Sequence, residues 1–342
     1  MFALQDLERA ERLVHAVLPA TAQHRWPLLA ERLDADVVVK HENHQATGAF
    51  KVRGGLVYAD RMKRERPHVA GLVSATRGNH GQSIAFAGRR LGVPVTIFVP
   101  HGNSVEKNRA MRALGAEVVE AGDDFDAARD AARSFAVDNA HELVPSFHRD
   151  LVLGVATYAL ELMTAEPALD VLYVPLGLGS GISACITVRD LLGRKTEIVG
   201  VQASAAPAYA LSLAAGRIVT TPSADTKADG IAVRMPDEQA FAIVRQGVAR
   251  IVQVSEDEIA EAIGIYWTDT HNLVEGAGAA PLAAALQERQ RLRNKRVGLV
   301  VSGGNIDMAL FNDWVLGRRR LAEAARRRVP AAAGDEWDTA VA

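Results

Sequence analysis

The chain has 342 residues, of which 49% are hydrophobic and 23% charged, an ordinary composition for a soluble globular protein. This length exceeds that of a usual single domain, so two lobes with a sizeable core are expected. The formal net charge of −2 gives no support for binding to nucleic acid or to an anionic membrane.

Three further features bear on location and redox chemistry. The first eight residues carry acidic side chains among apolar ones, which is unlike a signal peptide. No uninterrupted apolar segment reaches the roughly 18 residues that a membrane span needs. Cys185 is the single cysteine, which excludes an internal disulfide and a thiolate metal cluster. We therefore expect a cytoplasmic protein with no membrane partner.

Apolar periodicity predicts alternating helices and strands in the first part of the chain. Helical patterns are expected over residues 4–18, 52–62, 83–90, 104–114 and 125–139. Apolar runs typical of strands are expected over residues 37–40, 71–75, 93–100 and 116–120. Strands that alternate with helices indicate a parallel α/β sheet.

A second series of the same kind follows residue 145. Its predicted helices cover residues 151–163, 182–192, 238–248, 256–270 and 276–291, and its predicted strands cover residues 171–175, 197–202 and 296–302. From residue 307 the chain is expected to be helical into a basic run at 318–328, interpreted as a solvated face. The segment 321–342 is expected to be a disordered tail.

A lysine lies at the junction between the first predicted strand and the helical run that follows it. The segment 47–55 reads Thr-Gly-Ala-Phe-Lys-Val-Arg-Gly-Gly and places Lys51 where two elements can hold it rigidly and partly desolvate it. Desolvation lowers the pKa of a lysine and leaves a neutral amine that can attack carbonyl carbon. Most lysines beside a helix start are solvated surface residues, so Lys51 becomes a candidate through the motifs that follow it.

A glycine-rich loop joins the predicted strand at 171–175 to the helix at 182–192. It contains Gly177, Gly179 and Gly181, and backbone N–H groups freed by glycines at a helix start favour a phosphate. It differs from a P-loop, which ends in Gly-Lys-Ser/Thr, and from the dinucleotide fingerprint, which places two residues between its last glycines. A turn that serves only packing is the alternative, and a phosphate-bearing cofactor is the preferred interpretation.

These motifs occur together with Thr-Arg-Gly-Asn-His at 76–80, Leu-Val-Glu-Gly-Ala-Gly-Ala at 273–279 and Val-Ser-Gly-Gly-Asn at 301–305. In this order they resemble the fold type II pyridoxal-phosphate enzymes, specifically the threonine/serine dehydratase and serine racemase family. The resemblance covers residues 37–308. It implies the tryptophan synthase β-like α/β fold, with parallel twisted sheets flanked by helices in two lobes. Residues 1–49 and 146–320 would form the large cofactor-binding domain, and residues 50–145 the small domain.

The resemblance implies a role for each motif. Lys51 would form the Schiff base with pyridoxal 5'-phosphate and act as the catalytic base, while Phe50 would pack beside the cofactor ring. Ser302 would bond the pyridine nitrogen, and Glu275 would lie near the ring. A hydroxyl would not hold that nitrogen protonated, which favours β-elimination over transamination. Gly177, Leu178, Gly179, Ser180 and Gly181 would bind the phosphate, Asn79 the ring hydroxyl, and Thr76, Asn79 and His80 the substrate carboxylate.

The sequence departs from the family pattern at several positions. Arg77 replaces the serine that serves as a proton donor in serine racemases, and an arginine is not a proton shuttle at neutral pH. Arg77 is either a surface residue or a substrate-binding one. Leu178 and Ser180 interrupt the run of glycines typical of the phosphate loop, so Ser180 is a candidate to donate its hydroxyl to the phosphate.

A divalent-metal site of the family uses two carboxylates where this chain has Gln202 and Ala208. Because Mg²⁺ prefers charged oxygen ligands, we expect no metal site, while a monovalent cation held by backbone carbonyls stays open. The family also commonly forms homodimers, which we expect here.

The resemblance implies a dehydratase, or ammonia-lyase, that acts on a small β-hydroxy amino acid and releases a 2-keto acid and ammonia. Threonine, serine, 3-phenylserine and 3-hydroxyaspartate all stay open as substrates. Phe147 is interpreted either as core packing or, together with Val155, as part of a pocket that accepts an aromatic substituent, as in a phenylserine dehydratase-like member. The alternatives are a racemase, which Arg77 disfavours, a β-replacement enzyme, which His80 disfavours, a dinucleotide-dependent oxidoreductase and a non-catalytic binding protein.

Overall fold

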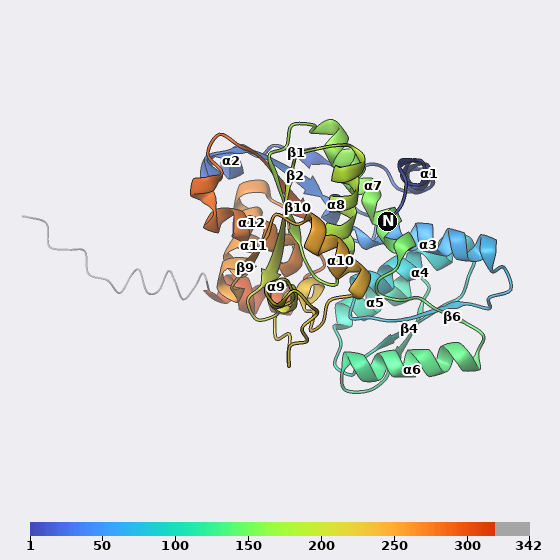
Figure 1. Ribbon diagram of the computed structural model, residues 1–342. Helices are drawn as coiled ribbons and strands as arrows, with labels where there is room; N and C mark the ends of the chain where they lie inside the picture. The colour runs from blue at the N-terminus through green and yellow to red at the C-terminus, as the bar shows by residue number, and fades with distance from the viewer. Residues whose placement is uncertain (319–342) are drawn as a thin grey trace, which may run out of the picture.

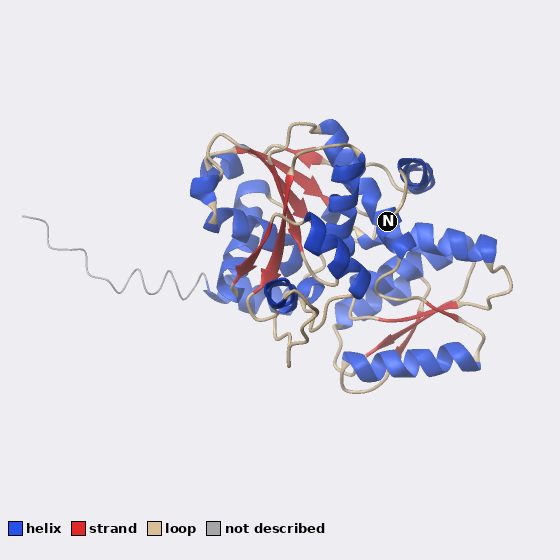
Figure 2. Ribbon diagram, viewed as in Figure 1, coloured by secondary structure: helices blue, strands red, loops and turns tan. Residues whose placement is uncertain are grey.

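The computed structural model describes residues 1–318 and shows two α/β lobes, each built on a mainly parallel sheet (Figures 1 and 2). The larger sheet has six strands in the order β1-β2-β10-β7-β8-β9 and the smaller sheet has four in the order β5-β4-β3-β6. The strands of the larger sheet are β1 (Gln23–His24), β2 (Asp36–His41), β7 (Val171–Pro175), β8 (Glu197–Ala203), β9 (Arg250–Val254) and β10 (Arg296–Val301). Those of the smaller sheet are β3 (Leu72–Ala75), β4 (Val95–Val99), β5 (Glu117–Glu120) and β6 (Glu142–Leu143).

The position of β10 determines which loops meet at the sheet edge. Every neighbouring pair in both sheets is parallel except β1 with β2. The strand β10, the last along the chain, lies between β2 and β7, pairing with one on each side. In a parallel sheet the carboxyl ends of the strands lie at one edge, where α/β proteins bind ligands. The loops after β2, β7 and β10 therefore lie at one edge, although their sequence positions span most of the chain.

Helices cover both faces of each sheet. In the larger lobe α7 and α8 pack on one face, while α11 and α12 pack on the other (Figure 1). In the smaller lobe α6 lies on one face of the sheet, and α4 and α5 lie on the opposite face (Figure 2). The helices are α1 (Leu4–His15), α2 (Pro27–Leu33), α3 (Lys51–Glu65), α4 (Asn79–Leu91), α5 (Val105–Ala113), α6 (Phe125–Asp138), α7 (Arg149–Ala165), α8 (Ser180–Leu191), α9 (Ala208–Ala215), α10 (Glu238–Gly247), α11 (Glu256–Thr270), α12 (Gly276–Gln287) and the short helical turns η1 (Glu42–His44), η2 (Asp229–Ile231), η3 (Arg289–Arg291), α13 (Met308–Leu310) and η4 (Phe311–Leu316).

Side-chain caps explain where several helices begin. Ser104 accepts a hydrogen bond from the N–H of Lys107 at the start of α5, and Asp124 accepts one from Ala127 at the start of α6. Ser255 and Glu258 form a reciprocal capping box before α11. Each cap satisfies an N–H group that the first turn of a helix leaves without a partner.

The predicted fold class is confirmed, and most predicted elements lie within a few residues of their observed bounds. The main differences are that α4 begins at Asn79 rather than residue 83 and that α12 ends at Gln287 rather than residue 291. The elements β1, α2, β6, α9 and β9 had no predicted counterpart. All strands of the smaller sheet lie within residues 50–145, and all strands of the larger sheet lie outside this range. The proposed domain boundaries at 49/50 and 145/146 themselves stay a prediction.

The predictions for the C-terminal end of the chain lie outside the described residues. These are the disordered tail at 321–342 and the basic run beyond Arg318. Within residues 1–318, no helix combines the length and the apolar character that crossing a membrane requires.

Candidate active site

The segment that carries Lys51 is tied to the loop after β10. The N–H of Phe50 donates to the carbonyl of Ser302 at 3.0 Å, and Ala49 forms an isolated β-bridge with Gly303. The N–H of Gly304 donates to the carbonyl of Gly48 at 2.9 Å. The predicted lysine motif and the predicted serine motif, far apart in sequence, therefore form one structural unit.

Lys51 is the first residue of α3, and its environment favours a neutral amine. Burial lowers the pKa of Lys51, and the charge of Glu275 only partly opposes this. The N-terminal end of a helix also disfavours a cation through the helix dipole. The Nζ atom lies 5.1 Å from the centre of the Phe50 ring, and the Lys51 carbonyl accepts a hydrogen bond from Ser83 Oγ at 2.6 Å. The backbone is thus fixed while the amine stays available for reaction.

Asn79, Glu275 and Asn305 form a hydrogen-bonded chain across the site. Asn79 Nδ2 donates to Glu275 Oε1 at 2.8 Å and to Oε2 at 3.1 Å. Asn305 Nδ2 in turn donates to Asn79 Oδ1 at 2.8 Å and to the carbonyl of Thr47 at 2.8 Å. Burial raises the pKa of Glu275, although Lys107 and Asn79 work in the opposite direction. The chain fixes the side chain of Asn79 relative to the lysine segment.

His80 is a buried polar residue of the site with an unpartnered ring nitrogen. Its side chain is 8% exposed, and its Nε2 atom has no hydrogen-bond partner among residues 1–318. Burial, followed by the charge of Lys51, lowers the pKa of His80 to about 3, so the imidazole is neutral at neutral pH. A buried polar atom without a partner is costly in a folded protein unless something binds to it. His80 therefore points to a polar ligand at this place.

The other two predicted substrate residues of this loop differ in exposure. Thr76 is buried and its Oγ1 accepts a hydrogen bond from the N–H of Gly78 at 3.1 Å, which shapes the turn into α4. Arg77 is exposed, and its guanidinium makes no hydrogen bond or ion pair with the described residues. The cation of Arg77 is thus not committed to holding the fold together.

The glycine loop forms a cradle at the start of α8. Gly179 has a φ of 111°, and a Cβ there would lie 2.7 Å from Tyr209 Oη. Tyr209 Oη donates to the carbonyl of Leu178 at 2.8 Å, which fixes the loop. The backbone N–H groups of residues 177–182 have no acceptor in the described part of the chain. Free donors at a helix start favour an anion, so this loop is the candidate anion site, and phosphate binding by residues 177–181 stays a prediction.

The anion site lies beside the lysine segment. A Cβ at Gly181 would lie 3.8 Å from Phe50 Cζ, so the loop and the residue before Lys51 are neighbours. Ser183 Oγ, one turn into α8, is buried and has no partner among the described residues. A cofactor with a phosphate at one end and an aldehyde within reach of a lysine fits these donors. The residues present therefore fit pyridoxal 5'-phosphate.

Comparison with known proteins agrees with this chemistry. Residues 18–303 match the family of pyridoxal-phosphate dependent enzymes. The chain belongs to this family. Its cofactor is pyridoxal 5'-phosphate, and it is an enzyme of the lyase class.

Three relatives illustrate the similarity. The chain is 40% identical over 298 residues to L-threonine ammonia-lyase of Geobacter sulfurreducens, which covers 87% of this chain and 73% of the relative. It is 31% identical over 292 residues to L-threo-3-hydroxyaspartate ammonia-lyase of Saccharomyces cerevisiae, covering 85% of this chain and 89% of that protein. The structure of the processed form of threonine deaminase isoform 2 from Solanum lycopersicum superposes with a TM-score of 0.85 at 28% identity, covering 92% and 94% of the two chains.

Gln202, which stands where the family has a metal-binding carboxylate, has a structural role in this chain. Gln202 Nε2 donates to the carbonyl of Ala206 at 3.1 Å, and its Oε1 accepts from the N–H of Ala210 at 2.9 Å. The amide thus fixes the turn into α9, which begins at Ala208. Residues 1–318 contain no cluster of three His, Cys, Asp or Glu side chains suited to a metal. The expectation of no divalent metal, and the open question of a monovalent cation, stay predictions.

Phe147 is a buried residue that is 8% exposed. It belongs to a large hydrophobic cluster that includes Leu151 and Val155 of α7. This placement supports the packing interpretation, while a contact between Phe147 and substrate stays a prediction.

Asn305 and Lys107 have positions in the site that sequence reasoning missed. Asn305 ends the Ser-Gly-Gly-Asn motif, and its place after β10 was the available signal. Lys107 of α5 packs its stem where a Cβ of Gly78 would lie, at 2.7 Å from Cδ, and its Nζ donates to Asp229 Oδ2 at 2.6 Å. No motif surrounds Lys107, so only the fold places it here.

Proposed function

We propose that the protein is a pyridoxal-phosphate-dependent dehydratase, or ammonia-lyase, that converts a β-hydroxy-α-amino acid into a 2-keto acid and ammonia by α,β-elimination. The observation that carries this proposal is the desolvated amine of Lys51 beside an anion cradle at residues 177–182. The similarity to threonine and 3-hydroxyaspartate ammonia-lyases supports the same reaction.

Each site residue has a role that follows from its environment. The bound cofactor supplies the electron sink for the α-carbon. Lys51, with its lowered pKa, takes the α-proton as a neutral general base. The free N–H groups of residues 177–182 hold the cofactor phosphate, with the Ser180 hydroxyl as an additional donor. With the cofactor bound, Phe50 would pack beside its ring, Asn79 would contact its hydroxyl, and Ser302 would bond its nitrogen.

The substrate carboxylate is assigned to the turn before α4. Thr76, Asn79 and neutral His80 surround it, and the unpaired Nε2 of His80 gives this turn a polar group that needs a partner. Arg77 is free of ion pairs with the described residues and is a candidate for a second contact with substrate. An arginine in this position does not deliver a proton at neutral pH, which disfavours racemisation.

Four candidate substrates differ only in the substituent on the β-carbon: threonine, serine, 3-phenylserine and 3-hydroxyaspartate. The burial of Phe147 in a hydrophobic cluster supports a compact pocket, and the relatives named for threonine and 3-hydroxyaspartate support those two. A homodimer in the cytoplasm is part of the proposal, and the resemblance of the sequence motifs to the family supports it.

The deciding experiment is the release of 2-keto acid by the purified, cofactor-loaded protein from these four amino acids, with threo and erythro forms compared for those that have both. We expect turnover of at least one of them, and a fall of about 10²- to 10⁴-fold in the Lys51→Ala variant, since the base is lost. Phenylserine as the best substrate would place Phe147 and Arg77 in the pocket. A yellow protein that releases no keto acid from any of the four would refute the dehydratase.

A further inference from the structure

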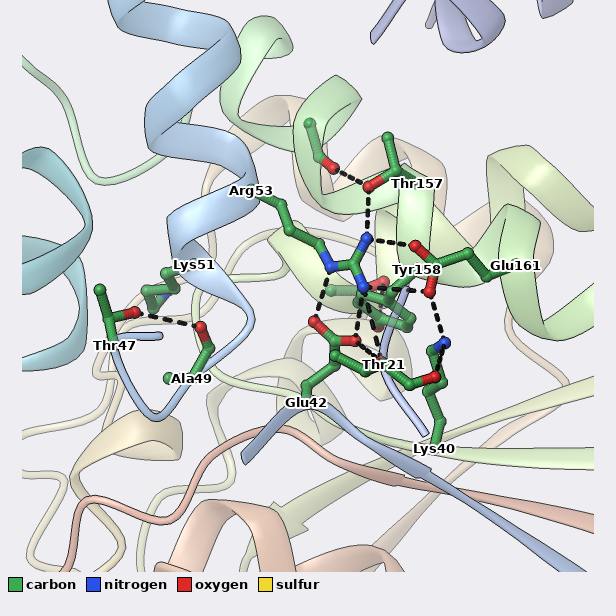
Figure 3. A network of polar contacts seen from close by, with 12 residues as sticks. Thr21, Lys40, Glu42, Thr47, Ala49, Lys51, Arg53, Thr157, Tyr158 and Glu161 are labelled. Atoms are coloured by element: carbon green, nitrogen blue, oxygen red, sulfur yellow. Dashed lines mark hydrogen bonds and ion pairs between the residues drawn. The ribbon is translucent and has the colours of Figure 1, made fainter. Parts of the chain in front are cut away.

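Arg53 is a fully buried cation two residues after Lys51 in α3 (Figure 3). Its Nε donates to Glu42 Oε2 at 2.8 Å and its Nη2 to Glu42 Oε1 at 3.0 Å. Its Nη1 donates to Glu161 Oε1 at 2.5 Å and to Thr157 Oγ1 at 2.9 Å. The guanidinium thus binds one carboxylate in a two-point fork and a second carboxylate from α7, which is a geometry that arginine favours over lysine.

The charges of this cluster balance within the protein. Lys40 is also fully buried, and its Nζ donates to Glu161 Oε2 at 2.5 Å and to the carbonyl of Thr21 at 3.1 Å. Two cations therefore face two carboxylates. Burial opposes the charged form of Glu161, but the hydrogen bond and charge of Arg53 outweigh it and lower the pKa of Glu161 to about 2. Loss of Arg53 would leave two buried carboxylates with one cation.

The ion pair between Arg53 and Glu42 closes the loop that carries Lys51. Glu42 follows β2 directly and Arg53 lies in the first turn of α3, so the segment between them contains Thr47, Phe50 and Lys51. On a helix, residues two apart point roughly 200° away from each other. The side chains of Lys51 and Arg53 therefore leave the helix on opposite sides, and Arg53 points into the buried cluster with Glu42 and Glu161 while Lys51 points away from it (Figure 3).

The start of α3 depends on such an anchor. Phe50, its N-cap, makes no side-chain cap, and its first turn has no acidic residue. The backbone packs closely against α7, since a Cβ at Gly154 would lie 2.3 Å from the carbonyl oxygen of Arg53. That contact limits how closely the two helices approach, and the guanidinium fork holds the Arg53 side of α3 against Glu42 and Glu161.

We propose that Arg53 is a positioning residue for the reaction, which fixes the rotation of α3 and thereby the place of the Lys51 amine. The proposal rests on the proposed function, in which Lys51 bonds the cofactor and takes the α-proton. A small rotation of α3 moves the amine without removing any group that touches substrate or cofactor. Misplacement of a reacting group by about 1 Å can cost about 100-fold in rate.

The test compares Arg53→Lys and Glu42→Gln with the wild type, all loaded with pyridoxal phosphate. Arg61→Met is the matched control, because Arg61 lies on the same helix and also pairs with two carboxylates, those of Glu65 and Asp150. Three readouts are taken on folded protein: kcat and KM, the pH dependence of the absorbance of the lysine-bound cofactor, and the fraction of Lys51 labelled by borohydride reduction, located by mass spectrometry.

We expect Arg53→Lys to lower kcat by about 100-fold and Glu42→Gln by about 10-fold, with KM within about threefold of the wild type. The pH midpoint of the cofactor absorbance shifts in both variants, and borohydride labelling of Lys51 becomes slower. Arg61→Met keeps the wild-type values of all three. If Arg53→Lys does not fold, Glu42→Gln alone carries the test.

Two results would overturn the inference, and they differ from failure of the proposed function. A folded Arg53→Lys or Glu42→Gln variant with the kcat, absorbance midpoint and labelling rate of Arg61→Met would show that the cluster only stabilises the fold. If the wild type is labelled at a lysine other than Lys51, or not at all, the proposed function fails, and the role of Arg53 fails with it.

Discussion

Burial of individual titratable side chains shifts their pKa values and so determines which of them carry charge. Burial lowers the pKa of both Lys51 and His80 and so favours their neutral forms, and the charge of Lys51 adds to the effect on His80. Glu275 has a raised pKa for the same reason, yet it accepts two hydrogen bonds from Asn79. A site of this kind lets a lysine act as a base at neutral pH while its neighbours stay bound in place.

His41 leads to a prediction about acid sensitivity. It is fully buried in β2, where its Nε2 accepts a hydrogen bond from Trp26 Nε1 at 3.0 Å, so the proton resides on Nδ1, 3.2 Å from Asn43 Oδ1. Burial, with the charge of His44, lowers the pKa of His41 from 6.5 to about 3. The unfolded chain therefore binds one more proton than the folded one between these values. The contribution of neutral His41 to the free energy of unfolding is therefore fully present above pH 6.5 and is lost as the pH falls toward 3.

We expect the free energy of unfolding of the wild type to fall more steeply with decreasing pH than that of His41→Gln. The difference in slope is about 1.4 kcal/mol per pH unit, which corresponds to one proton. Urea unfolding of the cofactor-free proteins at pH 6.5, 5.5 and 4.5 measures it. His101→Gln is the control, since its side chain is 58% exposed, and it should keep the wild-type slope. Equal slopes for wild type and His41→Gln would contradict the prediction.

Among the elements, the junction between β7 and α8 depends most on one residue. Gly179 adopts a left-handed backbone conformation that leaves the N–H groups at the start of α8 free. The hydroxyl of Tyr209 occupies the space where a side chain would start and binds the loop carbonyl of Leu178. The cradle is therefore set by backbone conformation and by a residue of α9, rather than by the side chains of the loop.

Gly179→Ala should weaken cofactor binding more than it weakens the fold. An L-residue in the left-handed conformation costs about 1–2 kcal/mol, and here the new Cβ also meets Tyr209 Oη and Ala240 Cβ, each at 2.7 Å. We expect Kd for pyridoxal phosphate, measured by absorbance titration, to rise by more than about tenfold. Gly193→Ala is the control, because Gly193 follows the same helix with a φ of 59° and open space around it. It should lose stability and keep its cofactor affinity; a similar Kd for both variants would argue against a preformed cradle.

In the whole molecule, contacts of the start of α5 link the two lobes. Lys107 pairs with Asp229, Ser104 Oγ donates to Asp307 Oδ1 at 2.7 Å, and the N–H of Met308 donates to Glu106 Oε1 at 3.0 Å. All three contacts link the start of α5 in the smaller lobe to η2 and to the start of α13 in the larger lobe. Burial lowers the pKa of Lys107, but the nearby carboxylates, Asp229 foremost, together outweigh it, so the pKa is raised. Lys107 therefore stays charged in this ion pair.

Removing this ion pair should loosen α5 without affecting the core. We expect Lys107→Met to lose about 1 kcal/mol of local stability, since Asp229 is 42% exposed and the pair is partly screened. Hydrogen exchange of the α5 amides should accelerate about fivefold, while α7, at the centre of the hydrophobic core, stays protected. Arg61→Met, which breaks a pair within the smaller lobe and one to α7, is the control for α5. Unchanged exchange in α5 would show that the pair does not hold the lobes together.

The sequence by itself determined the local features of this protein. Apolar periodicity placed most helices and strands, including α11 at its observed bounds, and the motif order identified the family and the cofactor. The role of Lys51 stays a prediction from the same motifs. It missed β1 and β6, which have two residues each, because so short a segment has no period to detect. Helix and strand positions follow from the conformational preferences and apolar spacing of neighbouring residues, which are present in the sequence before the chain folds.

The tertiary structure alone decided which of these residues meet. Asn305 reaches Asn79 because β10 is inserted between β2 and β7, an order that no local pattern reports. Arg53 finds Glu161, and Lys107 finds Asp229, across 108 and 122 positions of sequence. Burial then sets the pKa of Lys51, and burial depends on the packing of both lobes. Contacts between distant segments follow from strand order and packing, and these physical quantities exist only once the whole chain has folded.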